Sequence, residues 1–211
     1  MEQKPNLEAK KEQWEQVYSQ GKEKLPWLEN PIPKEILEDF SARFKKGDKI
    51  LDYGCGDGKL AEFLFQKGLA IVCSDISQKA LDLVSEKNPN IKTIQADEPS
   101  KITMNENFNG VLSWGVMHHV DKNLWSKYID QLVNITKDGG YILIGGHSTK
   151  DEEFSQGFRI SPTTGNVSTA VDSLESILQE QGLKIITSGY FDFKEGFTNK
   201  DRAFRYFLFQ K

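Results

Sequence analysis

Apolar positions along the chain follow two periods. Short apolar runs bounded by turn residues predict buried strands, and apolar residues spaced three and four positions apart predict amphipathic helices. The predicted strands cover 49–53, 69–74, 91–95, 110–114, 141–145, 184–190 and 202–210. The predicted helices cover 7–20, 34–46, 59–68, 77–87, 121–135 and 171–182. Strands that alternate with helices in this way favour an α/β fold, a doubly wound parallel sheet with ligands outside the carboxyl ends of its strands.

Three glycines occupy every second position in the turn between the first strand and the next helix. Gly54, Gly56 and Gly58 accept positive φ and let a ligand approach the backbone, where the helix also points its free N–H groups. A dehydrogenase would instead space its glycines as G-x-G-x-x-G around a pyrophosphate. Asp52 precedes this turn, and its carboxylate would repel a pyrophosphate and attract an ammonium group. A glycine-rich connection without a ligand is disfavoured because strand, acid, glycines and helix are all in register.

The segment Asp52-x-Gly54-x-Gly56-x-Gly58 resembles the first motif of the class I S-adenosylmethionine (SAM)-dependent methyltransferases. The resemblance covers the chain from about residue 34 to the end, predicted as one SAM-binding domain, 34–211. It implies a seven-stranded, mostly parallel sheet with helices on both faces and a C-terminal antiparallel hairpin. It also implies SAM as the cofactor of a methyl-transferring enzyme.

Acidic residues follow the second and third strands. Asp75 stands about 20 residues beyond the first glycine, as expected for an acid that binds ribose hydroxyls, although it could merely cap the helix at 77–87. By the resemblance, Asp97 or Glu98 accepts the adenine amino group, although a surface turn would also contain such residues. Three neighbouring residues complete the predicted cofactor-binding set: Ile76, Ser113 and Trp114.

Residues 1–33 are predicted to form an N-terminal helical arm. It carries Trp14, Tyr18 and Trp27, and stacked aromatic rings suit a flat adenine or a sulfonium cation, so the arm is a candidate lid. The same rings could simply cover the hydrophobic edge of the domain. W-x3-Y followed by P-W resembles the arm of the small-molecule methyltransferases of the thiopurine and tellurite-resistance types.

All three histidines follow the fourth and fifth predicted strands. His118, His119 and His147 therefore fall beside the methyl position that the resemblance implies, and histidine is the side chain best matched to proton removal near neutral pH. At most one of the adjacent pair is expected to face substrate, and we favour His118 and His147. A metal site is not indicated, because adjacent histidines rarely share one zinc ion and no cysteine or acid has ligand spacing.

The polar segment 149–169 is long for a connection and is predicted to close over a small acceptor. Within it, Arg159 is the expected anchor for an anionic acceptor, and Phe158 is expected to contact the acceptor as well.

Composition narrows the choice of partners. The 27 lysines and arginines against 31 aspartates and glutamates give a net charge of -4, with no basic stripe, so nucleic acid is disfavoured as substrate. No apolar run approaches the ~20 residues of a membrane span, and the first residues contain no apolar signal sequence. Cys55 and Cys73 fit a reducing compartment, which predicts a cytoplasmic location.

Methyl transfer to an O, N or S atom of a small molecule is the predicted function. No Asn/Asp-Pro-Pro-Tyr segment follows the fourth strand, no cysteine lies where a pyrimidine nucleophile would be, and no acid-rich metal motif is present. The alternatives are a protein side chain as acceptor, or a SAM-binding partner subunit without catalysis. The sequence leaves the acceptor and the oligomeric state open.

Overall fold

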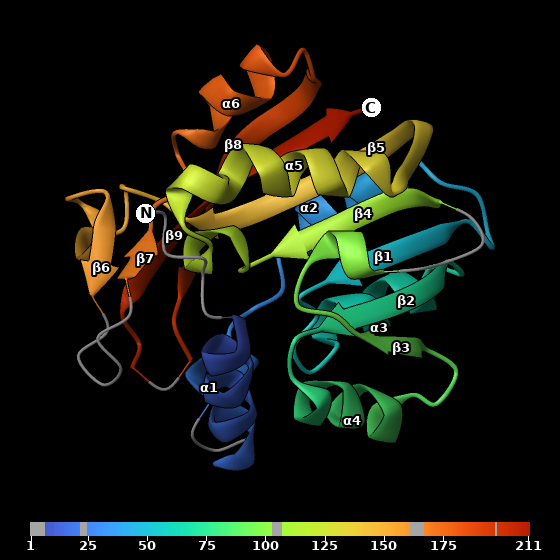
Figure 1. The fold of residues 1–211 in the computed structure, drawn as a ribbon, viewed down its shortest axis with the longest axis horizontal. Helices are drawn as coiled ribbons and strands as arrows, with labels where there is room; N and C mark the ends of the chain where they lie inside the picture. The colour runs from blue at the N-terminus through green and yellow to red at the C-terminus, as the bar shows by residue number, and fades with distance from the viewer. Residues whose placement is uncertain (1–6, 22–24, 103–106, 161–166, 197) are drawn as a thin grey trace.

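A seven-stranded sheet in the order β3-β2-β1-β4-β5-β9-β8 organises the chain (Figure 1). The computed structural model describes residues 7–21, 25–102, 107–160, 167–196 and 198–211. The strands are β1 Lys49–Tyr53, β2 Ala70–Asp75, β3 Lys92–Gln95, β4 Phe108–Trp114, β5 Thr136–His147, β8 Lys184–Lys194 and β9 Asp201–Gln210. Neighbours among β1 to β5 pair in parallel, whereas β9 is antiparallel to both β5 and β8. The predicted fold class and its C-terminal hairpin are therefore confirmed.

Each helix lies within a predicted range, although the second ends at Ser41 rather than at residue 46 and the fifth begins at Trp125 rather than at residue 121. The helices are α1 Leu7–Ser19, α2 Lys34–Ser41, α3 Lys59–Gln66, α4 Gln78–Lys87, α5 Trp125–Asn134 and α6 Leu174–Glu180. α6 begins three residues later than predicted, because the residues before it bond to the segment after β5. Val171 N donates to His147 O at 2.8 Å, and the Asp172 carboxylate accepts from Ser148 Oγ at 2.8 Å.

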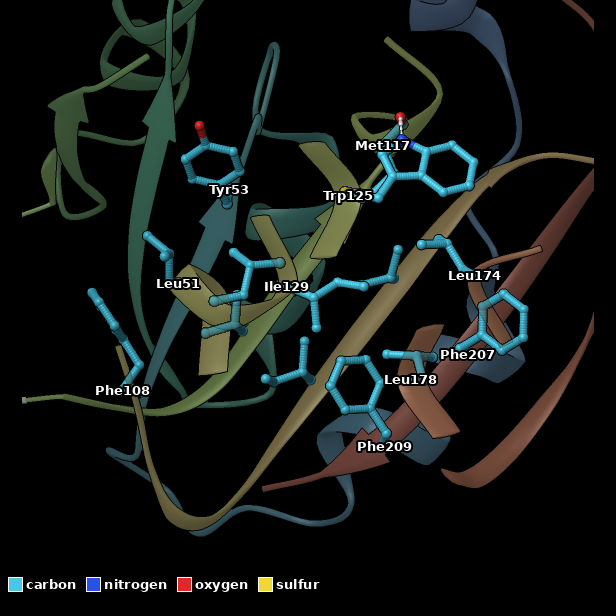
Figure 2. Packing of buried hydrophobic residues seen from close by; sticks show 14 of the residues in the cluster. Leu51, Tyr53, Phe108, Met117, Trp125, Ile129, Leu174, Leu178, Phe207 and Phe209 are labelled. Carbon is cyan, nitrogen blue, oxygen red and sulfur yellow. Dashed lines mark hydrogen bonds between the residues drawn. The ribbon is translucent and has the colours of Figure 1, made fainter. Parts of the chain in front are cut away.

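Alternate residues of the central strands face two hydrophobic layers. One layer packs Leu51, Val111 and Ile142 against α5 and α6, and the other packs Ile50, Leu112 and Leu143 against α2, α3 and α4. A strand buried on both faces needs an apolar side chain at nearly every position, which explains the continuous apolar runs in the sequence. Figure 2 shows the first layer, with Ile129, Leu174 and Phe207 pointing toward one another.

Trp125 at the start of α5 fixes the segment that follows β4. Its buried indole N–H donates to Met117 O at 3.1 Å (Figure 2) and to Val120 O at 3.0 Å. These bonds tie α5 to the 3₁₀ turn Met117–His119, which carries two of the three histidines. The core therefore positions this turn at the carboxyl end of β4.

The segment 149–169 contains structure that the sequence did not predict. A 3₁₀ turn at Glu152–Phe154 is followed by strand β6 Phe158–Ile160, which pairs antiparallel with β7 Val167–Thr169. Residues 161–166 of this segment lie outside the described residues. In Figure 1 the small hairpin stands beside the main sheet, and β7 contacts the 3₁₀ turn Met117–His119.

Within the described ranges, no helix combines the length and the apolar character that crossing a membrane requires.

Candidate active site

A cavity of about 780 Å³ lies along the carboxyl edge of the sheet. Its wall includes the last residue of four parallel strands, namely Tyr53 of β1, Asp75 of β2, Trp114 of β4 and His147 of β5. The carboxyl ends of parallel strands meet at one edge, which is where open α/β sheets bind ligands. The volume suits a cofactor together with a small second ligand.

The glycine turn forms part of this wall through Gly54 and Gly56, both with positive φ, 71° and 55°. A Cβ added to Gly54 would collide with the side chain of Val116, and one added to Gly56 would lie 2.8 Å from the Tyr18 hydroxyl. The turn therefore requires glycine for its backbone and for the close approach of its neighbours. Gly58, also predicted to bind cofactor, precedes α3 and is not part of the wall; a Cβ there would lie 2.8 Å from Val84.

Asp75 presents an oriented carboxylate to the cavity. Its Oδ2 accepts from Gly56 N at 3.0 Å, and its Oδ1 accepts from Ser77 N at 2.9 Å. Burial raises the pKa of Asp75, and these backbone hydrogen bonds oppose the shift. The N-cap of α4 is Ser77, whose Oγ accepts from Ala80 N, so capping does not explain Asp75.

Two other predicted cofactor residues, Asp52 and Ser113, are buried and are not part of the cavity wall. Asp52 is 2% exposed, and its Oδ2 has no hydrogen-bond partner among the described residues. Burial, with the charges of Asp75 and Asp57, raises the pKa of Asp52 to about 7. Ser113 is fully buried, whereas the next residue of β4, Trp114, does line the cavity.

The part of the wall after β3 contains the predicted adenine-binding residues Asp97 and Glu98, and Ile76 lies nearby in the same wall. Asp97 pairs with Lys101 at 2.7 Å, and Glu98 with Lys127 at 3.4 Å. Asp75, by contrast, has no lysine or arginine partner among the described residues. The acid that bonds to the glycine turn therefore suits a cation such as SAM better than a pyrophosphate.

The three predicted arm aromatics also line the cavity. The ring centroids of Trp14, Tyr18 and Trp27 lie 6.1–6.3 Å apart pairwise, and Trp14 lies 5.1 Å from His119. Glu15 connects α1 to the start of α4, because its carboxylate accepts from Ser77 Oγ at 3.1 Å and from Gln78 N at 2.6 Å. An acid at a helix N-terminus is stabilised there by the free N–H groups.

All three histidines lie in the cavity wall as one cluster. The ring centroid of His118 is 4.1 Å from that of His119 and 4.7 Å from that of His147. Both members of the adjacent pair line the cavity from a single 3₁₀ turn, and that at most one of them faces substrate stays a prediction.

The histidines are held as neutral imidazoles. Burial lowers the pKa of His118 well below its usual value, and it lowers the pKa of His119 to about 3 with added repulsion from His147 and Lys10. Burial also lowers the pKa of His147, but the Asp151 carboxylate opposes that shift. A lowered pKa weakens an imidazole as a base, so His147, where Asp151 opposes the shift, is the best suited of the three to accept a proton.

Asp151 is a candidate site residue that the sequence reasoning missed. Its Oδ2 lies 3.3 Å from Nδ1 of His147, and its Oδ1 lies 3.3 Å from Nη1 of the buried Arg202. Burial alone would raise the pKa of Asp151, but the His147 contact and the Arg202 charge outweigh it and hold the pKa below its usual value. The spacing His147-x-x-x-Asp151 could have indicated this contact from the sequence. The contact with Arg202 could not be foreseen in this way, because Arg202 lies on β9, far along the chain.

The predicted acceptor-binding residues differ in placement. Arg159 lines the cavity, but its Nε pairs with Glu153 at 2.9 Å, so it is not a free anion anchor. Phe158 is 48% exposed and lies outside the wall. The sequence missed three phenylalanines of the C-terminal hairpin that do line it: Phe191, Phe193 and Phe204.

Among the residues that the structure describes, no group of three histidine, cysteine, aspartate or glutamate side chains is placed to hold a metal ion.

A protein family described as a methyltransferase domain matches residues 27–188. Since this match covers most of the chain, the chain belongs to that methyltransferase family. This match confirms the resemblance to the class I SAM-dependent methyltransferases. It also confirms the predicted class of enzyme and its predicted cofactor, SAM. The narrower resemblance to the thiopurine and tellurite-resistance types stays a prediction.

Two curated relatives are methyltransferases. The mitochondrial ubiquinone biosynthesis O-methyltransferase of Rattus norvegicus is 26% identical over 193 residues, covering 81% of this chain and 54% of the relative. The tRNA (carboxymethyluridine(34)-5-O)-methyltransferase of Arabidopsis thaliana is 29% identical over 117 residues, covering 55% of this chain and 28% of the relative. The chain thus spans about half or less of the length of these relatives.

Solved structures share the fold. The 1,6-didemethyltoxoflavin-N1-methyltransferase of Burkholderia thailandensis, solved with its substrate and S-adenosylhomocysteine (SAH), has a TM-score of 0.75 at 13% identity, covering 99% of this chain and 92% of that one. A SAM-dependent methyltransferase of Methanosarcina mazei has a TM-score of 0.71 at 17% identity, covering 86% of this chain and 98% of that one.

Proposed function

We propose that this chain transfers the methyl group of SAM to an O, N or S atom of a small molecule, with a hydroxyl oxygen as the favoured acceptor. The observation that carries the proposal is one cavity whose wall contains both the glycine turn with Asp75 and the paired His147 and Asp151. A site that only bound SAM would not need the pair of His147 and Asp151. The two curated relatives, both O-methyltransferases by name, support oxygen as the acceptor atom.

The residues present fit SAM. The Asp75 carboxylate, fixed by two backbone N–H groups, would accept hydrogen bonds from ribose hydroxyls, and Asp97 or Glu98 would accept one from the adenine amino group. Trp14, Tyr18 and the neighbouring Trp27 would cover the cofactor as a lid, which makes residues 1–33 an arm over the domain 34–211. When bound, SAM supplies an electrophilic methyl group on a sulfonium sulfur.

His147 would accept the proton that a hydroxyl acceptor loses. Its imidazole is neutral, and the Asp151 carboxylate, 3.3 Å from Nδ1, would favour the tautomer that carries the proton on Nδ1, which would leave Nε2 as the proton acceptor. His118 and His119 would orient the acceptor beside it. Positioning in such a cavity supplies much of the rate of an in-line displacement.

We further propose that the acceptor is neither nucleic acid nor a protein side chain. The net charge of -4 disfavours binding to a phosphate backbone, and the cavity suits a small ligand. The cysteines are free, which fits the predicted cytoplasmic location.

Methyl-labelled SAM, incubated with the protein and with separate small-molecule, protein and RNA fractions of a cell extract, tests the proposal. We expect the label to appear in the small-molecule fraction. Label in the protein or RNA fraction alone would contradict it. So would SAM binding without transfer to any fraction, which would indicate a partner subunit without catalysis.

A further inference from the structure

Aromatic side chains occupy the end of the cavity formed by β5, β9 and β8. His147, Phe204 and Phe191 are direct cross-strand partners, since Phe204 pairs with His147 on one side and with Phe191 on the other. Residues directly opposite one another in adjacent strands project from the same face of a sheet. All three line the cavity, so the sheet presents a row of three rings there.

Two further rings complete this surface, which we call the aromatic wall: Trp114, His147, Phe191, Phe193 and Phe204. Phe204 is its centre, with ring centroids at 4.7 Å from His147, 5.3 Å from Phe193 and 5.6 Å from Trp114. Gly145 makes room for the indole, because a Cβ there would lie 2.4 Å from Trp114.

The aromatic wall lies far along the sheet edge from the ribose-binding carboxylate. Asp75 ends β2, whereas Phe191 is on β8, and four strands separate the two in the sheet. At about 4.8 Å between neighbouring strands, that is a separation well beyond one ligand ring. The wall therefore belongs to the acceptor rather than to the adenosine end of the cavity.

Charged groups near the wall are already neutralised within the protein. Arg202 contacts Asp151, Glu153 and Glu195 at 3.0–3.3 Å, and Glu153 also pairs with Arg159 and Lys200. The other described cations of the cavity wall are engaged as well: Lys10 with His119 O, Lys59 with Leu28 O and Asn30 O, and Lys127 with Glu98. Beside the five rings this leaves, among the described residues, no unpaired counter-ion for a carboxylate or an amine, since Lys10 and Lys59 come from α1 and α3 and Asp121 caps the 3₁₀ turn that follows it.

We propose that the acceptor is a flat, uncharged aromatic compound, held against the aromatic wall with the edge that bears its nucleophilic atom toward His147. Aromatic rings pack offset or edge-to-face at centroid distances of 4.5–7 Å, the spacing that rings of this wall already adopt with one another. A charged acceptor would lose hydration without gaining a partner. This inference rests on the proposed function and names its substrate class.

Calorimetric titration of the SAH-saturated protein with four probes of one skeleton tests the inference. The probes are 2-naphthol, trans-2-decalol, 2-naphthoate and 2-naphthylmethylamine. We expect 2-naphthol to bind, the saturated decalol to bind about fivefold more weakly, and the two charged probes at least about tenfold more weakly. Decalol binding as tightly as 2-naphthol, tighter binding of either charged probe, or no binding of 2-naphthol would overturn the inference.

Two neighbouring residues of β8 give a matched pair of variants. Phe191 lines the cavity, whereas Tyr190 points to the other side and is 50% exposed. Phe191→Leu should weaken 2-naphthol binding about fivefold, and Tyr190→Leu should leave it unchanged, with SAH affinity equal in both. Equal loss in both variants would contradict the inference. Failure of the wild type to bind SAH at all would instead contradict the proposed function.

Discussion

The carboxylate of Asp75 is fixed by the protein before a ligand arrives. Backbone N–H groups of Gly56 and Ser77 hold its two oxygens, which leaves its remaining lone pairs for the cavity. Hydrogen bonds to a charged acceptor contribute roughly 1.5–3 kcal/mol each. Asp75→Ala should therefore weaken SAM binding by at least about tenfold.

Calorimetry measures this loss, with Asp82→Ala as the control because Asp82 is an exposed acid of α4 that bonds only to Gln78 in the same helix. Unchanged SAM affinity in the Asp75 variant would remove Asp75 from the cofactor site.

The proposed roles of His147 and Asp151 predict changes in turnover and in its dependence on pH. Removing a general base costs about 10²–10⁴-fold in turnover, so His147→Ala should lose turnover on that scale and keep SAM affinity. The Asp151 carboxylate opposes the burial that lowers the pKa of His147. Asp151→Asn should therefore lower that pKa further, moving the acidic limb of the pH–rate profile to lower pH while turnover falls.

The exposed Asp192, which pairs with Lys150, supplies the control variant Asp192→Asn. A uniform loss of turnover with an unmoved pH profile would show that Asp151 only supports the fold. Turnover within a few fold of wild type after replacing each histidine would show that positioning alone carries the reaction.

The raised pKa of Asp52 should make the stability of the folded protein depend on pH. Its pKa is about 7 in the folded protein, above the ordinary aspartate value, so the folded state holds a proton that the unfolded state has released. Stability from this group is complete below the unfolded pKa and is lost as pH rises toward 7, by an amount on the order of a few kcal/mol.

Asp52→Asn should flatten this decline, because asparagine is neutral throughout. Urea unfolding without ligand between pH 5 and pH 8 measures the difference. An equal pH slope in the wild type and the variant would contradict the shifted pKa.

At the scale of elements, α1 is connected to α4 mainly through Glu15. Leu25 and Leu28 of the following segment are 2% and 8% exposed, so deleting the first 30 residues would also remove part of the core. Glu15→Gln is a narrower test: if α1 closes over the cofactor, SAM affinity should fall about three- to tenfold.

Glu12→Gln on the exposed side of α1 is the matched control. Thermal melts with and without SAM distinguish an arm that closes over the cofactor from an arm that only covers the core. A lowered melting temperature with an unchanged SAM-dependent shift would mean that α1 covers the core and is not a lid.

Elements with local signals were predictable from the sequence, and those that depend on distant contacts were not. The strand–glycine turn–helix unit was predicted because turn chemistry and apolar period are both local. The β6–β7 hairpin was missed because its strands have only three residues each, too few for a periodic pattern, and because their apolar residues Phe158, Ile160 and Val167 are exposed. α5 begins after a further 3₁₀ turn, Lys122–Leu124, that the apolar pattern does not distinguish from helix.

At the scale of the whole molecule, the rule that parallel strands bind ligands at their carboxyl ends located half of the candidate site. It brought Asp75 and the three histidines together from the strand order alone. Arg202 and Phe204 escaped prediction because they come from β9, whose antiparallel register against β5 and β8 is not specified by any local motif.

The central claim is that one cavity holds the cofactor at the Asp75 end and the acceptor at the His147 end. A crystal structure of the complex with SAH tests it most directly. We predict the ribose hydroxyls on Asp75, the adenine beside Asp97 and Glu98, and the sulfur facing the space in front of His118 and His147. An SAH molecule that binds with its sulfur turned away from these histidines, or outside this cavity, would contradict the account.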